Sequence, residues 1–194
     1  VVLGVDLSES MLKIAQKRCI GREDKLSFIQ SNIAEIDLKK KYDVVVSLFH
    51  VMSYQNSNVD LVKALQSAMK HLNSGGIFIF DFWYGPAVLT DLPATRVKRL
   101  ENDLIKITRI AEPHLNVEEG IVDVNFDIFI ENKATSEVIQ KKELHKMRYL
   151  FDTELEFICE KVGFEILNKY DWMVTSRPTS NSWNVVWVLK NIAT

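Results

Sequence analysis

The chain opens on Val1-Val2-Leu3-Gly4-Val5-Asp6-Leu7-Ser8-Glu9-Ser10-Met11-Leu12, and this stretch decides the fold. An apolar run that ends in an acid, followed by a Ser-rich turn and helical spacing, indicates a buried parallel strand leading into a helix. Asp6 ends that strand, where open α/β sheets bind ligands and a carboxylate can accept hydrogen bonds from ribose hydroxyls. A helix N-cap explains the same acid equally well.

The pattern of strands and helices continues beyond this opening. Residues 26–30 form a short apolar strand, and residues 42–49 predict a strand buried on both faces because β-formers and aliphatics stand in succession. The clearest helix is predicted over 59–72, and an apolar strand over 77–82. The resulting order over 1–82 predicts an α/β fold with parallel strands in a doubly wound sheet.

A different pattern begins after residue 84. Alternating apolar and polar residues predict three antiparallel strands, over 104–111, 121–130 and 138–149. We therefore interpret 85–150 as an antiparallel insertion laid against a core formed by 1–84 and 151–194. That core resumes at Thr153-Glu154-Leu155-Glu156, a capping-box pattern, and closes with an antiparallel strand pair over 164–172 and 182–190.

Composition narrows the function classes. The chain has 194 residues, 47% hydrophobic and 26% charged, as in an ordinary globular protein with a sizeable core. A net charge of -2 argues against nucleic acid or an acidic membrane as a partner. Cys19 and Cys159 both occupy apolar helical positions, which favours core packing and, weakly, a reducing, cytoplasmic compartment. No apolar run reaches the length of a membrane span.

Four stretches together resemble the class I S-adenosylmethionine-dependent methyltransferases. Residues 4–12 are similar to the family's second strand and its acidic motif, and Gln30-Ser31-Asn32-Ile33 to the turn after its third strand. Residues 42–47 are similar to its fourth strand, and residues 72–78 to the turn that leads into its fifth strand. The closing helix and antiparallel strand pair also match. The resemblance implies a Rossmann-like sheet that binds S-adenosylmethionine.

The resemblance also implies roles for residues along the cofactor side of the sheet. Asp6 would hold the ribose hydroxyls, and Leu7 and Met11 would flank the adenosyl group. Asn32, where the family usually has Asp, would meet the adenine together with Ile33. The methionine arm would lie beside two residues at the end of the fourth strand, Leu48 and Phe49. Core packing is the competing interpretation for the apolar members of this set.

Methyl transfer needs alignment and, for a nitrogen or oxygen acceptor, a way to remove a proton. His50 follows the strand of residues 42–49, on the cofactor side, and is a candidate base; His145, in the last insertion strand, is the other. A structural role explains either histidine as well as catalysis does. Aromatic residues after the strands that end at the site are candidates for an acceptor pocket: Tyr54, Trp83 and Tyr84. The histidines are scattered without a carboxylate cluster, so no metal site is predicted.

The family's Gly-rich loop and the strand before it should stand upstream of Asp6. That strand lies between the strands ending at Asp6 and Leu48, so the sheet predicted here lacks its first strand. We expect the intact protein to carry about 40 or more further N-terminal residues, by analogy with the dinucleotide fingerprint. We also expect the 194-residue chain alone to be poorly folded and inactive, because main-chain groups would go unpaired.

The acceptor is less sharply defined than the cofactor. The stretch Phe80-Asp81-Phe82-Trp83-Tyr84-Gly85-Pro86, followed by the insertion, is similar to the branch of the family that methylates amino groups of nucleotide-linked deoxysugars. In that branch the insertion covers the acceptor and can also support a homodimer. A small-molecule N-methyltransferase is therefore the first choice, and an O-methyltransferase follows. A nucleotide-binding oxidoreductase and a non-catalytic binding protein with a degenerate site are the alternatives from other classes.

Overall fold

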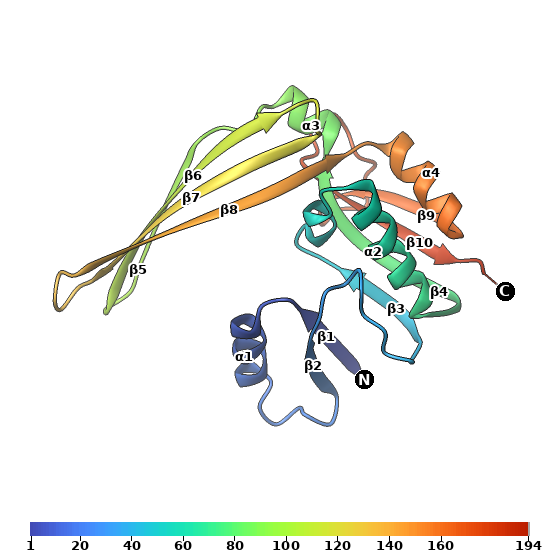
Figure 1. Cartoon of the computed structure of the whole chain (residues 1–194), viewed down its shortest axis with the longest axis horizontal. Helices are drawn as coiled ribbons and strands as arrows, with labels where there is room; N and C mark the ends of the chain where they lie inside the picture. Colours follow the sequence, from blue (N-terminus) through green and yellow to red (C-terminus); the bar gives the residue numbers. More distant parts are fainter. Residues whose placement is uncertain (194) are drawn as a thin grey trace.

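The chain has an α/β fold of three parts, shown in the computed structural model of Figure 1, which describes residues 1–193. A small N-terminal unit covers residues 1–30. The core is a mixed sheet with two helices on one face. Four long antiparallel strands extend from the core as an arm. The α/β class predicted from the order of elements is thereby confirmed.

The N-terminal unit is a parallel strand pair with one helix. β1 (Val2–Asp6) pairs in parallel with β2 (Leu26–Gln30), and α1 (Glu9–Arg18) packs on both strands. Gly4 is required here because a Cβ at this position would lie 2.6 Å from the Phe28 ring. Within the described residues β1 pairs with β2 alone.

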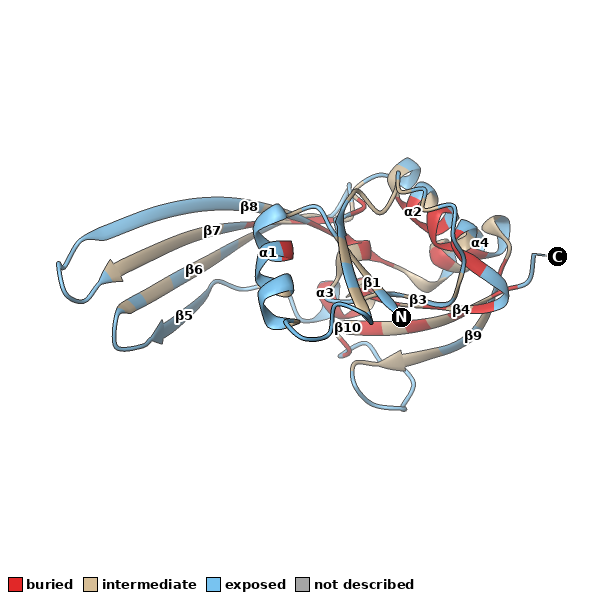
Figure 2. Ribbon diagram, turned by 90° about the horizontal axis from the view of Figure 1, so that it is seen from below, coloured by how far each residue is buried: buried red, intermediate tan, exposed pale blue. Residues whose placement is uncertain are grey.

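The core is built around one long strand. β4 (Leu72–Tyr84) pairs in parallel with β3 (Tyr42–Ser47) and antiparallel with β10 (Asn184–Asn191), which in turn pairs with β9 (Phe164–Asp171). The helical elements of this part are η1 (Val51–Tyr54), α2 (Asn58–Lys70) and α4 (Asp152–Val162). Figure 2 shows that the buried residues gather in this part of the molecule.

Apolar side chains of α2 and α4 meet one face of the core sheet. The cluster includes Leu61 and Leu65 of α2, Phe80 of β4, Leu155 of α4 and Trp187 of β10, each with 0% exposure. Together these side chains remove a large apolar area from water, the main source of stability in a fold of this size.

The strand predicted to be buried on both faces is covered on one only. Val45 of β3 packs against the core cluster, whereas Val44 and Val46 are 49% and 51% exposed. Two-sided burial requires helices on both faces of a sheet. Here α2 and α4 share one face, while α1 packs on β1 and β2. The expectation for residues 42–49 was therefore wrong about the second face.

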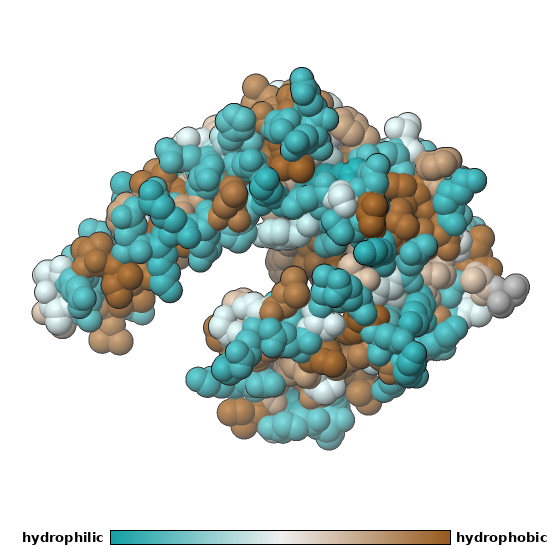
Figure 3. All heavy atoms as spheres, viewed as in Figure 1, coloured by the Kyte–Doolittle hydropathy of each residue, from teal (hydrophilic) through white to brown (hydrophobic). Residues whose placement is uncertain are grey.

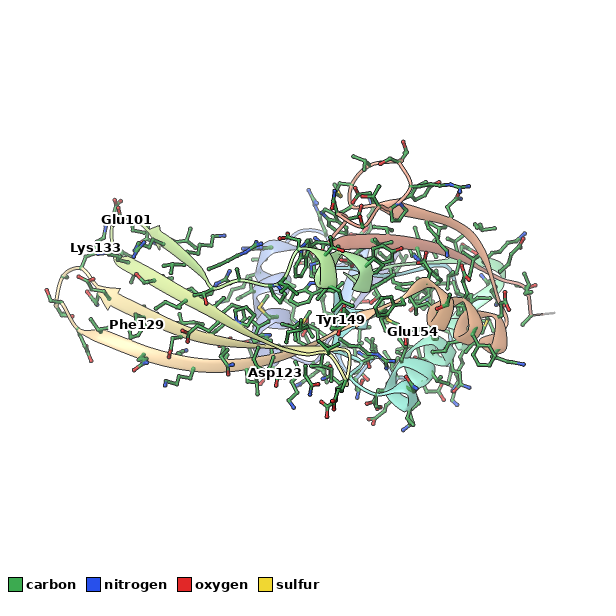
Figure 4. All side chains as sticks on the ribbon, turned by 90° about the horizontal axis from the view of Figure 1, so that it is seen from above. Glu101, Asp123, Phe129, Lys133, Tyr149 and Glu154 are labelled. Carbon is green, nitrogen blue, oxygen red and sulfur yellow. The ribbon has the colours of Figure 1, made fainter. Side chains whose placement is uncertain are left out.

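From the sequence we expected the insertion to lie against the core, but in the structure the arm continues the core sheet. Its strands are β5 (Arg96–Glu101), β6 (Ile105–Asn116), β7 (Ile121–Asn132) and β8 (Val138–Leu150). They pair antiparallel in chain order, and the end of β8 joins the end of β4 in a short parallel contact. Figure 4 shows Glu101 and Lys133 at the free end of the arm and Tyr149 at its root.

Two elements at the start of the insertion were not predicted. Short helix α3 (Gly85–Thr90) follows β4 directly, and β5 adds a fourth strand where the sequence predicted three. β5 is exposed at every residue and is mostly charged, so it offers little of the apolar pattern on which strand prediction depends. Its place is determined by pairing with β6.

A buried arginine holds the root of the arm to the core. The Arg148 side chain is 10% exposed and donates to Asn58 Oδ1 at 2.5 Å and to Glu154 Oε2 at 3.2 Å. Glu154 also accepts from the backbone N–H of Phe151 at 3.0 Å. The N-terminus of α4 is therefore capped by the Glu154 carboxylate on the N–H of Phe151, and the N-cap lies two residues before the predicted Thr153-Glu154-Leu155-Glu156 box.

Candidate active site

The ends of β3 and β4 bring His50 and Asp81 together. The backbone N–H of His50 donates to both carboxylate oxygens of Asp81, at 3.2 and 3.1 Å. Nδ1 of His50 lies 2.7 Å from Oδ2 of Asp81, but the two atoms are not aligned as a hydrogen bond requires. The Asp81 side chain is completely buried, and its contacts with His50 compensate for the hydration that the carboxylate loses.

The backbone at this point is strained. Phe49 and His50 have φ values of 63° and 65°, a left-handed conformation that non-glycine residues seldom adopt. Strain of this kind persists only where the surroundings enforce it, and it is frequent at functional sites. The paired hydrogen bonds to Asp81 supply that enforcement, and they fix where the His50 ring stands.

Aromatic rings surround His50 on two sides. Its ring centroid lies 6.3 Å from those of Trp83, at the end of β4, and Trp172, just after β9. Phe49 lies 6.2 Å from Trp172, and Trp183 meets Trp83 edge-on at 5.5 Å. The predicted pair of His50 and Trp83 is thus brought together, and two tryptophans from the loop between β9 and β10 join it.

A second group links the arm to the core. The hydroxyl of Tyr54, at the end of η1, lies 2.6 Å from Nδ1 of His145 on β8. On its other side Nε2 of His145 lies 3.3 Å from Oε2 of Glu143. Burial, and secondarily the charge of Glu143, raises the pKa of Tyr54. Both residues named as candidates from sequence meet here, although they stand 91 positions apart.

Tyr84 does not join the other predicted pocket residues. Its ring packs against the core cluster, 6.4 Å from Phe82, and its hydroxyl donates to Asp152 Oδ2 at 3.3 Å. Alternation along β4 explains this, because adjacent residues of a strand point to opposite faces. Trp83 faces His50, so Tyr84 faces the helices. Burial, then the nearby Asp152 charge, raises the pKa of Tyr84.

On the cofactor side, Asp6 stands exposed at the carboxyl end of β1. Its Oδ1 accepts from the N–H of Ser8 at 2.7 Å. Ser8 is the N-cap of α1, since its hydroxyl accepts from Met11 N at 3.3 Å. Among residues 1–193, Oδ2 of Asp6 has no hydrogen bond. The next residue, Leu7, and Met11 expose 66% and 54% of their surface, so apolar area stands uncovered beside the free oxygen.

The remaining cofactor-side residues divide into two kinds. Oδ1 of Asn32 accepts from Ala34 N at 3.0 Å in a tight turn, and Ile33 packs against the core cluster. Both residues therefore have a structural role, and within the described chain the side-chain N–H₂ of Asn32 makes no hydrogen bond. Leu48 and Phe49 are 38% and 75% exposed, which is unusual for large apolar side chains beside a sheet end.

These residues fit one half of an adenosyl cofactor site. An exposed carboxylate with one free oxygen suits the vicinal hydroxyls of a ribose, and uncovered apolar side chains suit an adenine ring. Figure 3 shows a hollow between the arm, the core and the N-terminal unit, and apolar atoms, drawn in brown, lie beside it. Within residues 1–193 no group of three or more His, Cys, Asp and Glu side chains could hold a metal ion. No helix described here is long and apolar enough to cross a bilayer.

Sequence reasoning missed four members of the groups around His50 and His145, namely Asp81, Glu143, Trp172 and Trp183. Asp81 stands inside an apolar strand, and Glu143 inside a charged one, so neither carries a local motif. Trp172 follows a strand that the sequence did predict, at the same sheet edge as Trp83. That shared edge was the one signal that could have identified it.

Comparison with known proteins shows what the chain is similar to. Residues 1–76 match the family described as "Methyltransferase domain". A dTDP-3-amino-3,4,6-trideoxy-alpha-D-glucopyranose N,N-dimethyltransferase of Streptomyces venezuelae is 31% identical over 88 residues, which is 45% of this chain and 35% of that protein. The chain thus spans only about a third of that curated relative.

Solved structures extend the likeness to the whole chain. An S-adenosylmethionine-dependent methyltransferase from Clostridium acetobutylicum superposes with a TM-score of 0.83 at 20% identity, covering 97% of this chain and 74% of that one. The sugar N-methyltransferase KedS8 from Streptoalloteichus gives 0.77 at 17%, covering 96% and 70%. Residues 1–76 thus match a methyltransferase domain, and the fold of the whole chain resembles that of S-adenosylmethionine-dependent methyltransferases of known structure.

Proposed function

We propose that the protein transfers a methyl group from S-adenosylmethionine to the amino group of a small molecule, with a nucleotide-linked amino sugar as the first candidate. The observation that carries the cofactor part is the exposed Asp6 carboxylate at the carboxyl end of β1, with uncovered Leu7 and Met11 beside it. The amine is suggested by the relative that dimethylates an amino sugar.

When bound, the cofactor supplies a methyl group on a sulfonium, ready for in-line displacement. The chain's own residues must then bind the acceptor, exclude water and take a proton from the amine. Phe49, Trp83 and Trp172 provide apolar walls around His50. His50, fixed by Asp81 at the sheet end, is one proton acceptor, and His145 on the arm is the other.

The arm completes this arrangement. It reaches from the end of β4 over the side on which Tyr54 and His145 meet, so we infer that residues 85–150 cover the acceptor. We also infer that the exposed strands of the arm support a homodimer, and light scattering of the purified protein across a dilution series tests this. A monomer at all concentrations would remove the dimer from the proposal.

Cofactor binding is the first test, in the protein as its gene encodes it. Titration calorimetry should show micromolar binding of S-adenosylmethionine and S-adenosylhomocysteine and no binding of NAD. Asp6→Asn should weaken both by at least about tenfold, because a carboxylate accepts hydrogen bonds better than an amide oxygen. Asp24→Asn, an exposed change in the same unit, is the matched control. NAD binding would favour an oxidoreductase, and no binding at all a degenerate site.

Turnover is the second test, with dTDP-3-amino-3,4,6-trideoxyglucose as the acceptor probe. His50→Ala should slow methylation at least about tenfold if His50 takes the proton, since general base catalysis commonly contributes more than that. His114→Ala changes an exposed histidine of β6 and should leave the rate unchanged. An unaltered rate in His50→Ala would remove that residue as the base.

A further inference from the structure

Both ring nitrogens of His145 are occupied. Nδ1 meets the Tyr54 hydroxyl at 2.6 Å, and Nε2 meets Glu143 Oε2 at 3.3 Å. The ring also stands edge-on to Phe126, 5.0 Å between centroids, which closes a further side. An acceptor amine therefore has no free nitrogen of His145 to approach directly.

One neutral tautomer satisfies both contacts. A carboxylate can only accept, so Nε2 carries the proton and donates it to Glu143. Nδ1 is then an acceptor, and the phenol of Tyr54 donates to it. Glu143 thus does for this imidazole what a buried carboxylate does in catalytic triads, where it fixes the ring's tautomer and stabilises the imidazolium that forms.

Few other charges face this group. From β7 the neighbours of the ring are Val124, directly opposite, and Phe126. From β6 the Arg109 guanidinium lies over the Phe126 ring at 5.0 Å, and from η1 comes Tyr54 itself. Glu143 is therefore the acid in direct contact with His145, and Arg109 is the cation one ring away.

Resting on the proposed function, we propose that Tyr54 is the catalytic residue that meets the acceptor, that His145 draws the Tyr54 proton, and that Glu143 is the positioning residue. As an N–H bond of the acceptor ammonium breaks, its proton goes to the phenol oxygen and its electron pair stays on nitrogen. The phenol O–H bond breaks together with it, and that proton goes to Nδ1. The imidazolium is balanced by Glu143 and later loses a proton to solvent.

The environment of Tyr54 is consistent with the roles proposed for Tyr54, His145 and Glu143. Burial and the Glu143 charge raise the pKa of Tyr54, so the phenol is protonated near neutral pH and cannot accept a proton unless it gives up its own. His145 is the group positioned to receive it. Tyr54 is 43% exposed, so one side of its ring is accessible to a bound acceptor.

A latch that only ties the arm to the core would use the same three residues, and the kinetics below distinguish the two roles. The relay also requires one tautomer of His145, which can be tested without any acceptor. In protein with ¹⁵N-labelled histidine, two-bond ¹H–¹⁵N spectra should show His145 with its proton on Nε2. Glu143→Gln should give a mixture of the two His145 tautomers. Glu131→Gln, on β7 of the same arm, should leave the tautomer unchanged. A proton on Nδ1, or spectra indifferent to Glu143→Gln, would overturn the relay even if methylation were confirmed.

Kinetics with the amino-sugar probe supply the second arm of the test. Tyr54→Phe should lower kcat about a hundredfold and Glu143→Gln about tenfold, the range of general acid–base effects. Glu143→Asp should recover part of the loss, and the acidic limb of the pH–rate profile should move in Glu143→Gln. Tyr170→Phe, on β9, is the control.

Unchanged affinity for S-adenosylhomocysteine in these variants shows that they are folded. A higher KM with kcat and the pH profile unmoved would mean a latch and would overturn the relay. If the probe is not methylated, the proposed acceptor class fails, and the relay is still overturned independently by spectra that show the proton of His145 on Nδ1.

Discussion

The core and the N-terminal unit each contain a parallel strand pair and amphipathic helices, yet they bury very different amounts of surface. The core cluster contains fully buried residues from α2, β4, α4 and β10, including Phe80 and Trp187. In the N-terminal unit Leu12 is the one buried hydrophobic residue, and its exposed fraction is 8%. Secondary structure of the same type therefore does not imply stability of the same size.

The difference also divides the candidate site. Asp6, Leu7 and Met11, the residues that fit an adenosyl group, stand on the weakly buried unit. His50 and Asp81, which fit proton transfer, stand on the core sheet. Because a ligand stabilises whatever state it binds, cofactor binding should order the N-terminal unit more than the core. Cofactor affinity and core stability should accordingly respond to different substitutions.

The largest contrast is expected between the two thiols, one in each region. Burial raises the pKa of the Cys159 thiol from its ordinary 9.0 to about 12, so at neutral pH its reactive thiolate is about a thousandfold scarcer than that of an ordinary thiol. Cys19, on the N-terminal unit, is only half-buried. Maleimide at pH 7 should modify Cys19 alone in native protein and both thiols in urea. Mass spectrometry of the peptides measures this.

Labelling at equal rates would mean that the core opens as readily as the N-terminal unit, contrary to the burial contrast. Cys19→Ser is the control, because its native protein should take up no maleimide on the time scale of the experiment. Rapid modification of Cys159 in that variant would contradict the enclosed position of α4 on the core sheet.

Side-chain truncation should separate the regions by several kcal/mol. Phe80→Ala removes a fully buried ring and should lower the free energy of unfolding by about 3–5 kcal/mol. Leu12→Ala should cost less than about 2 kcal/mol, because the surroundings of Leu12 are partly open and can collapse. Urea unfolding followed by tryptophan fluorescence measures the first change. Amide exchange in β1 and β2 detects the second, since local opening there need not unfold the core. Equal global effects would refute the contrast.

Much of the fold could be predicted because the spacing of apolar residues within short segments indicates its strands and helices. The strand at 26–30, the apolar stripe of α2 and the antiparallel closing pair all follow from patterns within a few residues. β5 could not be predicted in this way, because its exposed, charged residues are ordered by pairing with β6. The burial of β3 was overestimated because no local pattern tells how many faces of a sheet the helices cover.

The candidate site was predictable to the extent that strand ends identify it. Asp6 and Trp83 lie at the ends of strands and His50 follows one, and the rule that ligands meet the carboxyl ends of strands is enough to place them. The contact between Tyr54 and His145 depends on the path of the whole arm, which no spacing in the sequence encodes. Asp81 looks like an isolated acid in an apolar run until the strained turn at His50 supplies its partner.

The smallest test makes one substitution in both regions. Ser57 caps α2 by accepting from Asp60 N at 3.1 Å, and Ser8 caps α1 by accepting from Met11 N at 3.3 Å. Loss of a serine cap costs about 1 kcal/mol of helix stability. Ser57→Ala should therefore lower the global free energy of unfolding by about 1 kcal/mol, because α2 belongs to the cooperative core. Ser8→Ala should leave the global value unchanged and instead speed amide exchange in α1 about fivefold, the same energy expressed as local opening. A global loss of equal size from both variants would show that the two regions unfold as one unit.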